Sequence, residues 1–162
     1  MLVKFFGFTL PFATAALIGD WLTKLLVVDR LKGKPPYVIF ESWFKFDYVE
    51  NRGMAFGIGR NMPYARYILT GLGLVALFFV WQKVSQIQHR QKLGAIAFGL
   101  ILGGAIGNII DRLMNGFVTD FIVNFWRTHY WPAYNIADSC ICVGVGLLLI
   151  AFSGERSIRT MS

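Results

Sequence analysis

The sequence predicts an all-α membrane protein with four transmembrane helices and a small β-rich or interfacial segment in its first long loop. Two observations lead to this prediction. The chain of 162 residues is 56% hydrophobic and has a mean hydropathy of +0.54, which is too apolar for a soluble domain of this length. It also contains four apolar stretches that approach the roughly 20 residues a helix needs to cross the hydrocarbon core. We therefore treat residues 1–162 as a single integral membrane domain.

Each predicted span is close to the length of a transmembrane helix. The spans run from Phe5 to Val28, Tyr64 to Val84, Leu93 to Arg112 and Pro132 to Gly154. The first continues through Asp20 and Lys24 with no small-residue cleavage site in a polar flank, so we expect it to be retained and not removed as a signal peptide. An even number of spans places both termini on one side of the membrane, and the connections 29–62 and 113–131 on the other.

Two segments in the first long connection favour β-structure. Tyr37–Phe40 and Phe44–Val49 are rich in aromatic and β-branched residues, and Pro35, Pro36 and Ser42 interrupt the chain around them. We expect a small sheet or an interfacial cap in this connection.

The third span carries a stripe of small residues. Gly99, Gly103 and Gly107 recur at intervals of four residues, which would let a neighbouring helix approach closely. Helix packing, and not direct chemistry, is the role that we expect of this stripe.

The net charge of +7 is spread over short segments, with no basic run that has exposed aromatic residues between its charges. A membrane protein that faces anionic lipid explains this charge better than a nucleic-acid partner does. The Lys and Arg counts do not determine the orientation, because the short connection has Lys83, Arg90 and Lys92 whereas the long first one has six such residues.

Ionisable residues within membrane spans are costly and therefore suggest function. Asp20 and Lys24 lie four residues apart, close enough on one helix face to form a structural ion pair. Asn108, Asp111 and Arg112 share one face at the end of the third span. Two interpretations stay open for this group, because Arg112 could extend to the lipid headgroups or take part in a site.

The parity of the spans predicts that the polar residues converge at one membrane face. The converging residues are Asp20, Asn51, Asn108, Asp111, Arg112, Asp120, Asn135 and Asp138. Two neighbouring carboxylates share one proton, because their like charges separate their apparent pKa values. Such a pair can activate water and protonate a leaving amine.

Metal and triad chemistries have little support in the sequence. His89 and His129 have no partners at metal-ligand spacing, and no Ser or Cys stands beside a base. We expect no metal and no cofactor, which leaves the acids as candidate catalysts.

Five segments in order resemble the bacterial lipoprotein signal peptidases, or type II signal peptidases, over nearly the whole chain. They are GDWLTK at 19–24, NRGMAFG at 51–57, GGAIGNIIDR at 103–112, VTDFI at 118–122 and YNIADS at 134–139. The resemblance implies an aspartyl endopeptidase that cuts diacylglyceryl-modified prolipoproteins immediately before the lipid-modified cysteine, without a cofactor.

The resemblance also assigns roles to residues. The catalytic pair matches Asp120 and Asp138, and Asp111 becomes a structural acid. The residues that shape the site or bind substrate are then Asp20, Lys24, Asn51, Gly53, Asn108, Asp111, Arg112 and Asn135. Met54 stands where many members have a small residue, and Tyr134 where phenylalanine is usual. Neither change touches the acids.

The family's orientation implies a multi-pass protein of the bacterial inner membrane, with both termini cytoplasmic and the site near the periplasmic face. We expect a monomer whose partners are prolipoproteins and membrane lipids. A small transporter or proton pathway is an alternative, but the acids cluster at one edge and no internal repeat is visible. A noncatalytic assembly factor would leave the crowding of acids unexplained.

Overall fold

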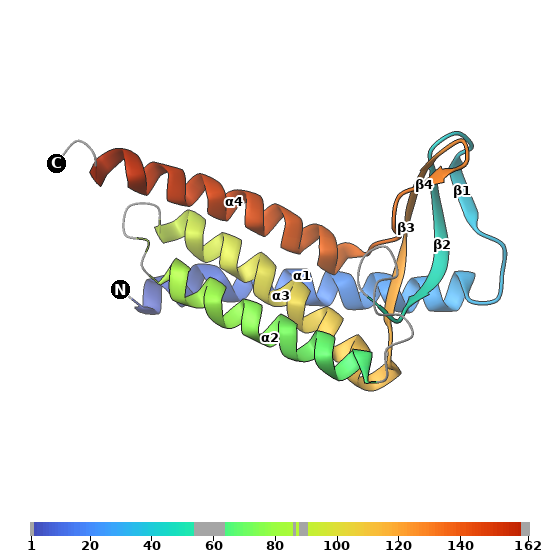
Figure 1. The fold of residues 1–162 in the computed structure, drawn as a ribbon, viewed down its shortest axis with the longest axis horizontal. Coiled ribbons are helices and arrows are strands. Elements are labelled where there is room, and N and C mark those ends of the chain that lie inside the picture. Colours follow the sequence, from blue (N-terminus) through green and yellow to red (C-terminus); the bar gives the residue numbers. More distant parts are fainter. Residues whose placement is uncertain (1, 54–63, 86, 88–90, 160–162) are drawn as a thin grey trace.

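Four long helices and one small sheet make up the described part of the chain (Figure 1). The computed structural model describes residues 2–53, 64–85, 87 and 91–159. The helices are α1 (Leu2–Leu31), α2 (Ala65–Val84), α3 (Gln91–Asn115) and α4 (Ile136–Arg159). All four contain a stretch long and apolar enough to cross a membrane, which confirms the predicted spans. Helix α1 begins and α4 ends at the same end of the bundle, as the even number of spans requires (Figure 1).

The fourth helix begins at Ile136 and not at Pro132 as the hydropathy suggested. Tyr134 instead forms an isolated antiparallel bridge with Ile122, and its backbone N–H donates to the Ile122 carbonyl at 3.1 Å. Residues 132–134 are apolar, but they precede the helix, and Tyr134 pairs with the sheet. Hydropathy alone does not separate an apolar strand segment from the first turn of a helix.

The sheet caps the end of the bundle opposite the termini. Its antiparallel strands follow the order β1-β2-β3-β4. They are β1 (Tyr37–Phe40), β2 (Phe44–Asn51), β3 (Val118–Trp126) and β4 (His129–Tyr130). The two predicted segments are therefore strands, whereas β3 and β4 were not predicted. An irregularity between Phe46 and Val49 sets the register that pairs Val49 with Asp120.

Helix α3 lies at the centre of the bundle, packed closely against α1 and α4. A Cβ atom added at Gly103 would collide with the carbonyl oxygen of Ala13 on α1, and one at Gly104 with that of Ala137 on α4. One at Gly107 would lie 2.7 Å from the Asp20 carboxylate. The small-residue stripe thus serves packing, as predicted, and it also leaves room for a charged side chain.

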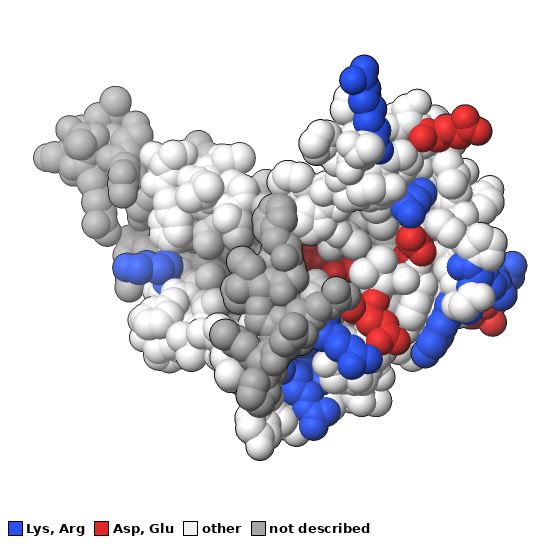
Figure 2. All heavy atoms as spheres, turned by 45° about the vertical axis from the view of Figure 1, so that its right-hand side comes forward, with Lys and Arg blue, Asp and Glu red and all other residues white. Residues whose placement is uncertain are grey.

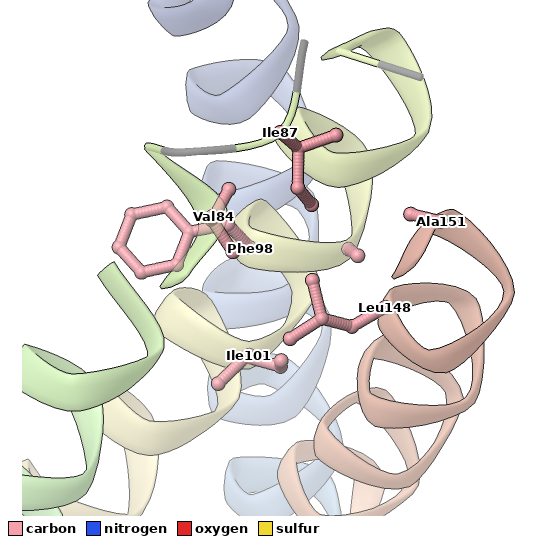
Figure 3. Packing of buried hydrophobic residues seen from close by; sticks show 7 residues of the cluster. Val84, Ile87, Phe98, Ile101, Leu148 and Ala151 are labelled. Carbon is pink, nitrogen blue, oxygen red and sulfur yellow. The ribbon is translucent and has the colours of Figure 1, made fainter. Parts of the chain in front are cut away.

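The apolar core lies at the end of the helices that is remote from the sheet. The residues that pack there (Figure 3) are Val84 of α2, Ile87 between α2 and α3, Phe98 and Ile101 of α3, and Leu148 of α4. The buried charged and amide side chains of the described residues, which are those of Asp20, Lys24, Asn108, Asp120 and Asn135, belong to the opposite half of the molecule. Apolar contacts therefore hold one end of the bundle and polar contacts the other.

Replacing Gly103 by alanine should destabilise the protein, because the new methyl group meets the backbone of α1 and the helices must separate. We expect a cost of about 1–3 kcal/mol, seen as a lower melting temperature in detergent. Gly146→Ala is the matched control, since nothing lies within 4 Å of the atom it adds on α4. Equal melting temperatures for the two variants would contradict this account of the packing.

Candidate active site

A buried lysine lies at the centre of the polar cluster. The Lys24 Nζ is 2.7 Å from an Asp20 carboxylate oxygen and 3.0 Å from one of Asp111, and it donates to the Asn108 amide oxygen at 3.2 Å. Three acceptors match the three protons of an ammonium group. A charge buried at the end of a membrane span needs such partners. The predicted Asp20–Lys24 pair is confirmed, and Asp111 joins it.

The two acids bound to Lys24 also join elements of the fold. The other oxygen of Asp20 accepts from the backbone N–H of Ala137 at 2.9 Å, in the first turn of α4. Such N–H groups have no partner within their own helix. The Asp111 oxygen that contacts Lys24 also accepts from the Thr119 N–H on β3 at 3.1 Å. Through these bonds α1 and α3 hold the start of α4 and the start of β3.

Asn135 and Asp138 cap the start of α4. The Asn135 side-chain oxygen accepts from the Asp138 N–H at 2.9 Å, and an Asp138 carboxylate oxygen accepts from the Asn135 N–H at 3.3 Å. This reciprocal pair is a capping box with Asn and Asp in its two positions. The Asp138 carboxylate is thereby fixed at the positive end of the helix dipole.

The amide of Asn108 links Lys24 to Asp138. Its oxygen accepts from Lys24, and also from the Asn135 amide nitrogen at 3.1 Å. Because an ammonium group only donates, the amide oxygen must face Lys24 and the amide nitrogen must face away. That nitrogen donates to the free oxygen of Asp138 at 2.8 Å.

Asp120 on β3 is held by two other amides. One of its oxygens accepts from the Asn135 nitrogen at 2.8 Å and the other from the Asn51 nitrogen at 2.8 Å. The Asn51 amide is itself oriented, because its oxygen accepts from the Gly53 N–H at 3.1 Å. Asp120 is 1% exposed, whereas Asp138 is half-buried. Asn135 therefore contacts both carboxyl groups. Asp138 is its capping partner, and Asp120 accepts a hydrogen bond from its side-chain amide.

The surroundings of Asp120 raise its pKa from the ordinary 3.8 to about 7. Burial is the main cause, and the negative charge of Asp138 adds to it, while the hydrogen bonds from Asn51 and Asn135 oppose the shift. The two carboxyl groups are neighbours, since Asn135 is hydrogen-bonded to both. A carboxyl group with a pKa near neutrality can both hold and release a proton at working pH.

Arg112 lies beside this cluster, half-buried at the end of α3. Its guanidinium donates a long hydrogen bond of 3.4 Å to the Asn108 carbonyl oxygen. Among the residues that the structure describes, Arg112 forms no ion pair, although the acids influence it electrostatically. Figure 2 shows acidic side chains in a hollow near the middle of the molecule, with basic ones beside it.

The structure brings the predicted site residues into one connected group, except for Arg112, which borders it. Positions 54–57 of the second motif, including Met54, lie outside the described residues, as does His89. Tyr134 donates its hydroxyl to Asn124 at 3.0 Å and not to the acids. The sequence analysis missed Thr119 and Ala137, which contribute backbone groups. No side-chain pattern could have revealed them.

Two further features bear on the chemistry. Within the described part of the chain, no group of three or more His, Cys, Asp and Glu residues could hold a metal ion. A groove of about 480 Å³ lies between α1 and α3, with Lys24 and Asp111 among its lining. Neither Asp120 nor Asp138 lines this groove, so it is separate from the pair of carboxyl groups that Asn135 joins.

The chain is similar to known proteins along most of its length. It matches the family described as signal peptidase (SPase) II over residues 12–153. A lipoprotein signal peptidase of Syntrophotalea carbinolica is 42% identical over 147 residues, which cover 90% of this chain and 91% of that protein. Another, from Vibrio cholerae, is 33% identical over 153 residues, covering 93% and 90%.

Solved structures agree with this similarity. A structure described as a bacterial membrane enzyme superposes with a TM-score of 0.70 at 28% identity, covering 90% of this chain and 87% of the other. A second gives a TM-score of 0.68 at 27% identity, with 87% and 89% covered. Family match, relatives and fold all agree, and the chain belongs to the signal peptidase II family.

Proposed function

We propose that this protein is an aspartic endopeptidase that removes signal peptides from prolipoproteins, with Asp120 and Asp138 as its catalytic pair. One observation carries the choice of residues. Asp20 and Asp111 are ion-paired with Lys24, whereas Asp120 and Asp138 receive hydrogen bonds only from neutral amide and backbone donors among the described residues. An ammonium partner would hold a carboxylate ionised. Neutral donors do not hold a carboxyl group in its ionised form, so the group can take up and release a proton.

The two carboxyl groups take different roles in the proposed mechanism. Asp138, which is half-buried, accepts a proton from water as that water attacks the scissile carbonyl carbon. Asp120 donates its proton to the carbonyl oxygen, since its raised pKa of about 7 leaves a large fraction of the group protonated near neutral pH. When the tetrahedral intermediate collapses, the proton on Asp138 passes to the leaving amine. Asp120 regains its proton from the hydroxyl group.

The proposed substrate is a prolipoprotein with a diacylglyceryl-modified cysteine, cut immediately before that cysteine. The membrane spans support this choice, because Asp120 is on β3 and Asp138 is in the first turn of α4. Strand β3 and the start of α4 lie at the end of the bundle opposite the termini (Figure 1). A lipid-modified residue is held near headgroup depth by its acyl chains. In the proposed orientation, the termini are cytoplasmic and the sheet lies on the periplasmic side of the inner membrane.

Arg112 is proposed to orient the substrate and not to transfer protons. A guanidinium group stays protonated at any working pH, and it offers several donors in a planar fork. Among the described residues its one hydrogen bond is the long one to Asn108, which leaves donors for a peptide carbonyl. The negative charges of the neighbouring acids attract the Arg112 guanidinium group electrostatically.

Asp120→Asn and Asp138→Asn should each lower the rate of cleavage about 100-fold or more, because an amide can neither accept nor deliver the required proton. The assay follows signal-peptide release from a diacylglyceryl-modified prolipoprotein by the purified protein in detergent. Asp29→Asn is the matched control, since Asp29 is exposed and pairs only locally with Arg30. Substantial turnover by either variant would remove that residue from the catalytic pair.

The parent protein should lose stability as the pH rises from about 3.8 to about 7 through the titration of Asp120. Stability falls as the pH rises because the pKa is raised, which means that the folded protein binds this proton more tightly than the unfolded chain does. Melting temperatures of the parent and of Asp120→Asn across this range measure the effect. The variant should show the weaker pH dependence, and identical curves would contradict the raised pKa.

Arg112→Lys should be less active than the parent with an unchanged pH profile, because the charge remains and the fork geometry is lost. The measurement is the rate of prolipoprotein cleavage as a function of pH. A shifted profile would mean that Arg112 sets the protonation of the carboxyl groups directly. Full activity in both Arg112→Lys and Arg112→Ala would mean that the side chain only extends to the headgroups.

A further inference from the structure

The outer end of the sheet exposes large aromatic side chains that the catalytic proposal does not use. Trp126, Tyr130 and Trp131 are 63%, 62% and 63% exposed. We call these three residues the aromatic edge. The segment that contains them, residues 125–131 (FWRTHYW), has one arginine and no acidic residue.

Burial decreases along β3 toward this edge. Val118 and Phe121, at the bundle end of the strand, are buried, whereas Trp126 at the turn is exposed. Local contacts hold the Tyr130 ring of the edge in place. The rings of Phe125 and Tyr130 stack at 5.6 Å, and the Lys45 ammonium lies 5.7 Å from the centre of the Tyr130 ring. The sheet therefore presents a preformed apolar surface that its own fold does not cover.

The position of the edge relative to the membrane follows from the helices. The strands run across the direction of the helices, and the β3–β4 turn lies on the same side of the bundle as α4 (Figure 1). Helix α4, which is a membrane span, begins at Ile136, five residues after Trp131. The lipid surface must therefore lie close to the edge, beside the point where α4 enters the membrane.

We propose that the aromatic edge docks onto the phospholipid headgroup layer beside α4. Trp and Tyr prefer the membrane–water interface, where the ring meets acyl chains and the polar atom meets water. Arg127, held at the tip of the turn with φ 54°, brings a positive charge to the depth of the lipid phosphates. The surface thus continues the membrane contact that α4 begins.

Docking would also set the height of the two carboxyl groups above the lipid, a consequence that rests on the proposed function. Asp120 is on the same strand as Trp126, and Asp138 is in the first turn of the helix that follows Trp131. An anchored edge would hold both at the depth where a lipid-modified cysteine lies. The enzyme would then meet its substrate by diffusion in the plane of the membrane.

The first experiment measures docking without catalysis. A full-length variant with Trp21→Phe, Trp43→Phe and Trp81→Phe keeps Trp126 and Trp131 as its only tryptophans. It is reconstituted in phospholipid vesicles that carry bromine either near the top of the acyl chains or near their ends. We expect quenching mainly by the shallow bromine, and little quenching by iodide in the water.

The matched control places a single tryptophan at position 37. Tyr37, at the start of the outer strand β1, is as exposed as Trp126 at 63%, but two strands separate it from β4. Tyr37→Trp, with all five native tryptophans replaced by Phe, should be quenched by iodide and not by bromine. Strong iodide quenching of Trp126 and Trp131 would overturn the proposal. Protection from both quenchers would also overturn it, because protein and not lipid would then cover the edge.

The second experiment tests the consequence for catalysis. Trp126→Ser with Trp131→Ser should raise the apparent KM for a prolipoprotein embedded in vesicles several-fold while kcat stays close to that of the parent. Tyr37→Ser should change neither constant. If the bromine result holds and KM does not change, the edge docks but does not present substrate. If the parent itself does not cleave prolipoprotein, the proposed function fails while the docking result stands.

Discussion

The ion pairs of Lys24 are the interaction on which the rest of the site depends. An ammonium group buried at the end of a membrane span is costly by several kcal/mol unless it is fully paired. Its partners Asp20 and Asp111 come from α1 and α3, and the same two acids bind backbone groups of α4 and β3. One cation therefore orders four elements. It also sets the direction of the Asn108 amide, which would otherwise be free to turn its oxygen toward Asp138.

The four buried or half-buried acids near this lysine fall into two classes by their partners. Asp20 and Asp111 are both ion-paired with Lys24 and act as structural ties. Asp120 and Asp138 are bound by asparagine side chains, which hold a carboxyl group in place without cancelling its charge. This difference explains why the cluster contains three asparagines. An amide can position a titrating group precisely because it does not itself titrate.

The helical part of the fold could be predicted from the sequence, because four apolar stretches long enough to cross a membrane form few structures other than transmembrane helices. The aromatic and β-branched runs before Asn51 likewise predicted β1 and β2. Strand β3 was missed, since Asp120 and Asn124 stand among apolar residues on one of its two sides, so VTDFIVNFW has no clean alternation of apolar and polar residues. The residues of the cluster could be named and the resemblance implied their roles, but most of their hydrogen-bond partners could not be predicted. Whether an acid pairs with Lys24 or with an asparagine depends on contacts between residues far apart in the chain.

Through Asn135, the arrangement of the two carboxyl groups depends on the first turn of α4. The residue caps α4 and at the same time holds Asp120, and its capping partner is Asp138. Helix ends are where local unfolding begins, because their hydrogen bonds are the fewest and the most easily exchanged for water. Fraying of the first turn of α4 would thus loosen both carboxyl groups together, leaving Asp120 bound by Asn51 and Asp138 by Asn108. The lifetime of the assembled pair is bounded by the opening rate of that turn, and not by the far slower unfolding of the bundle.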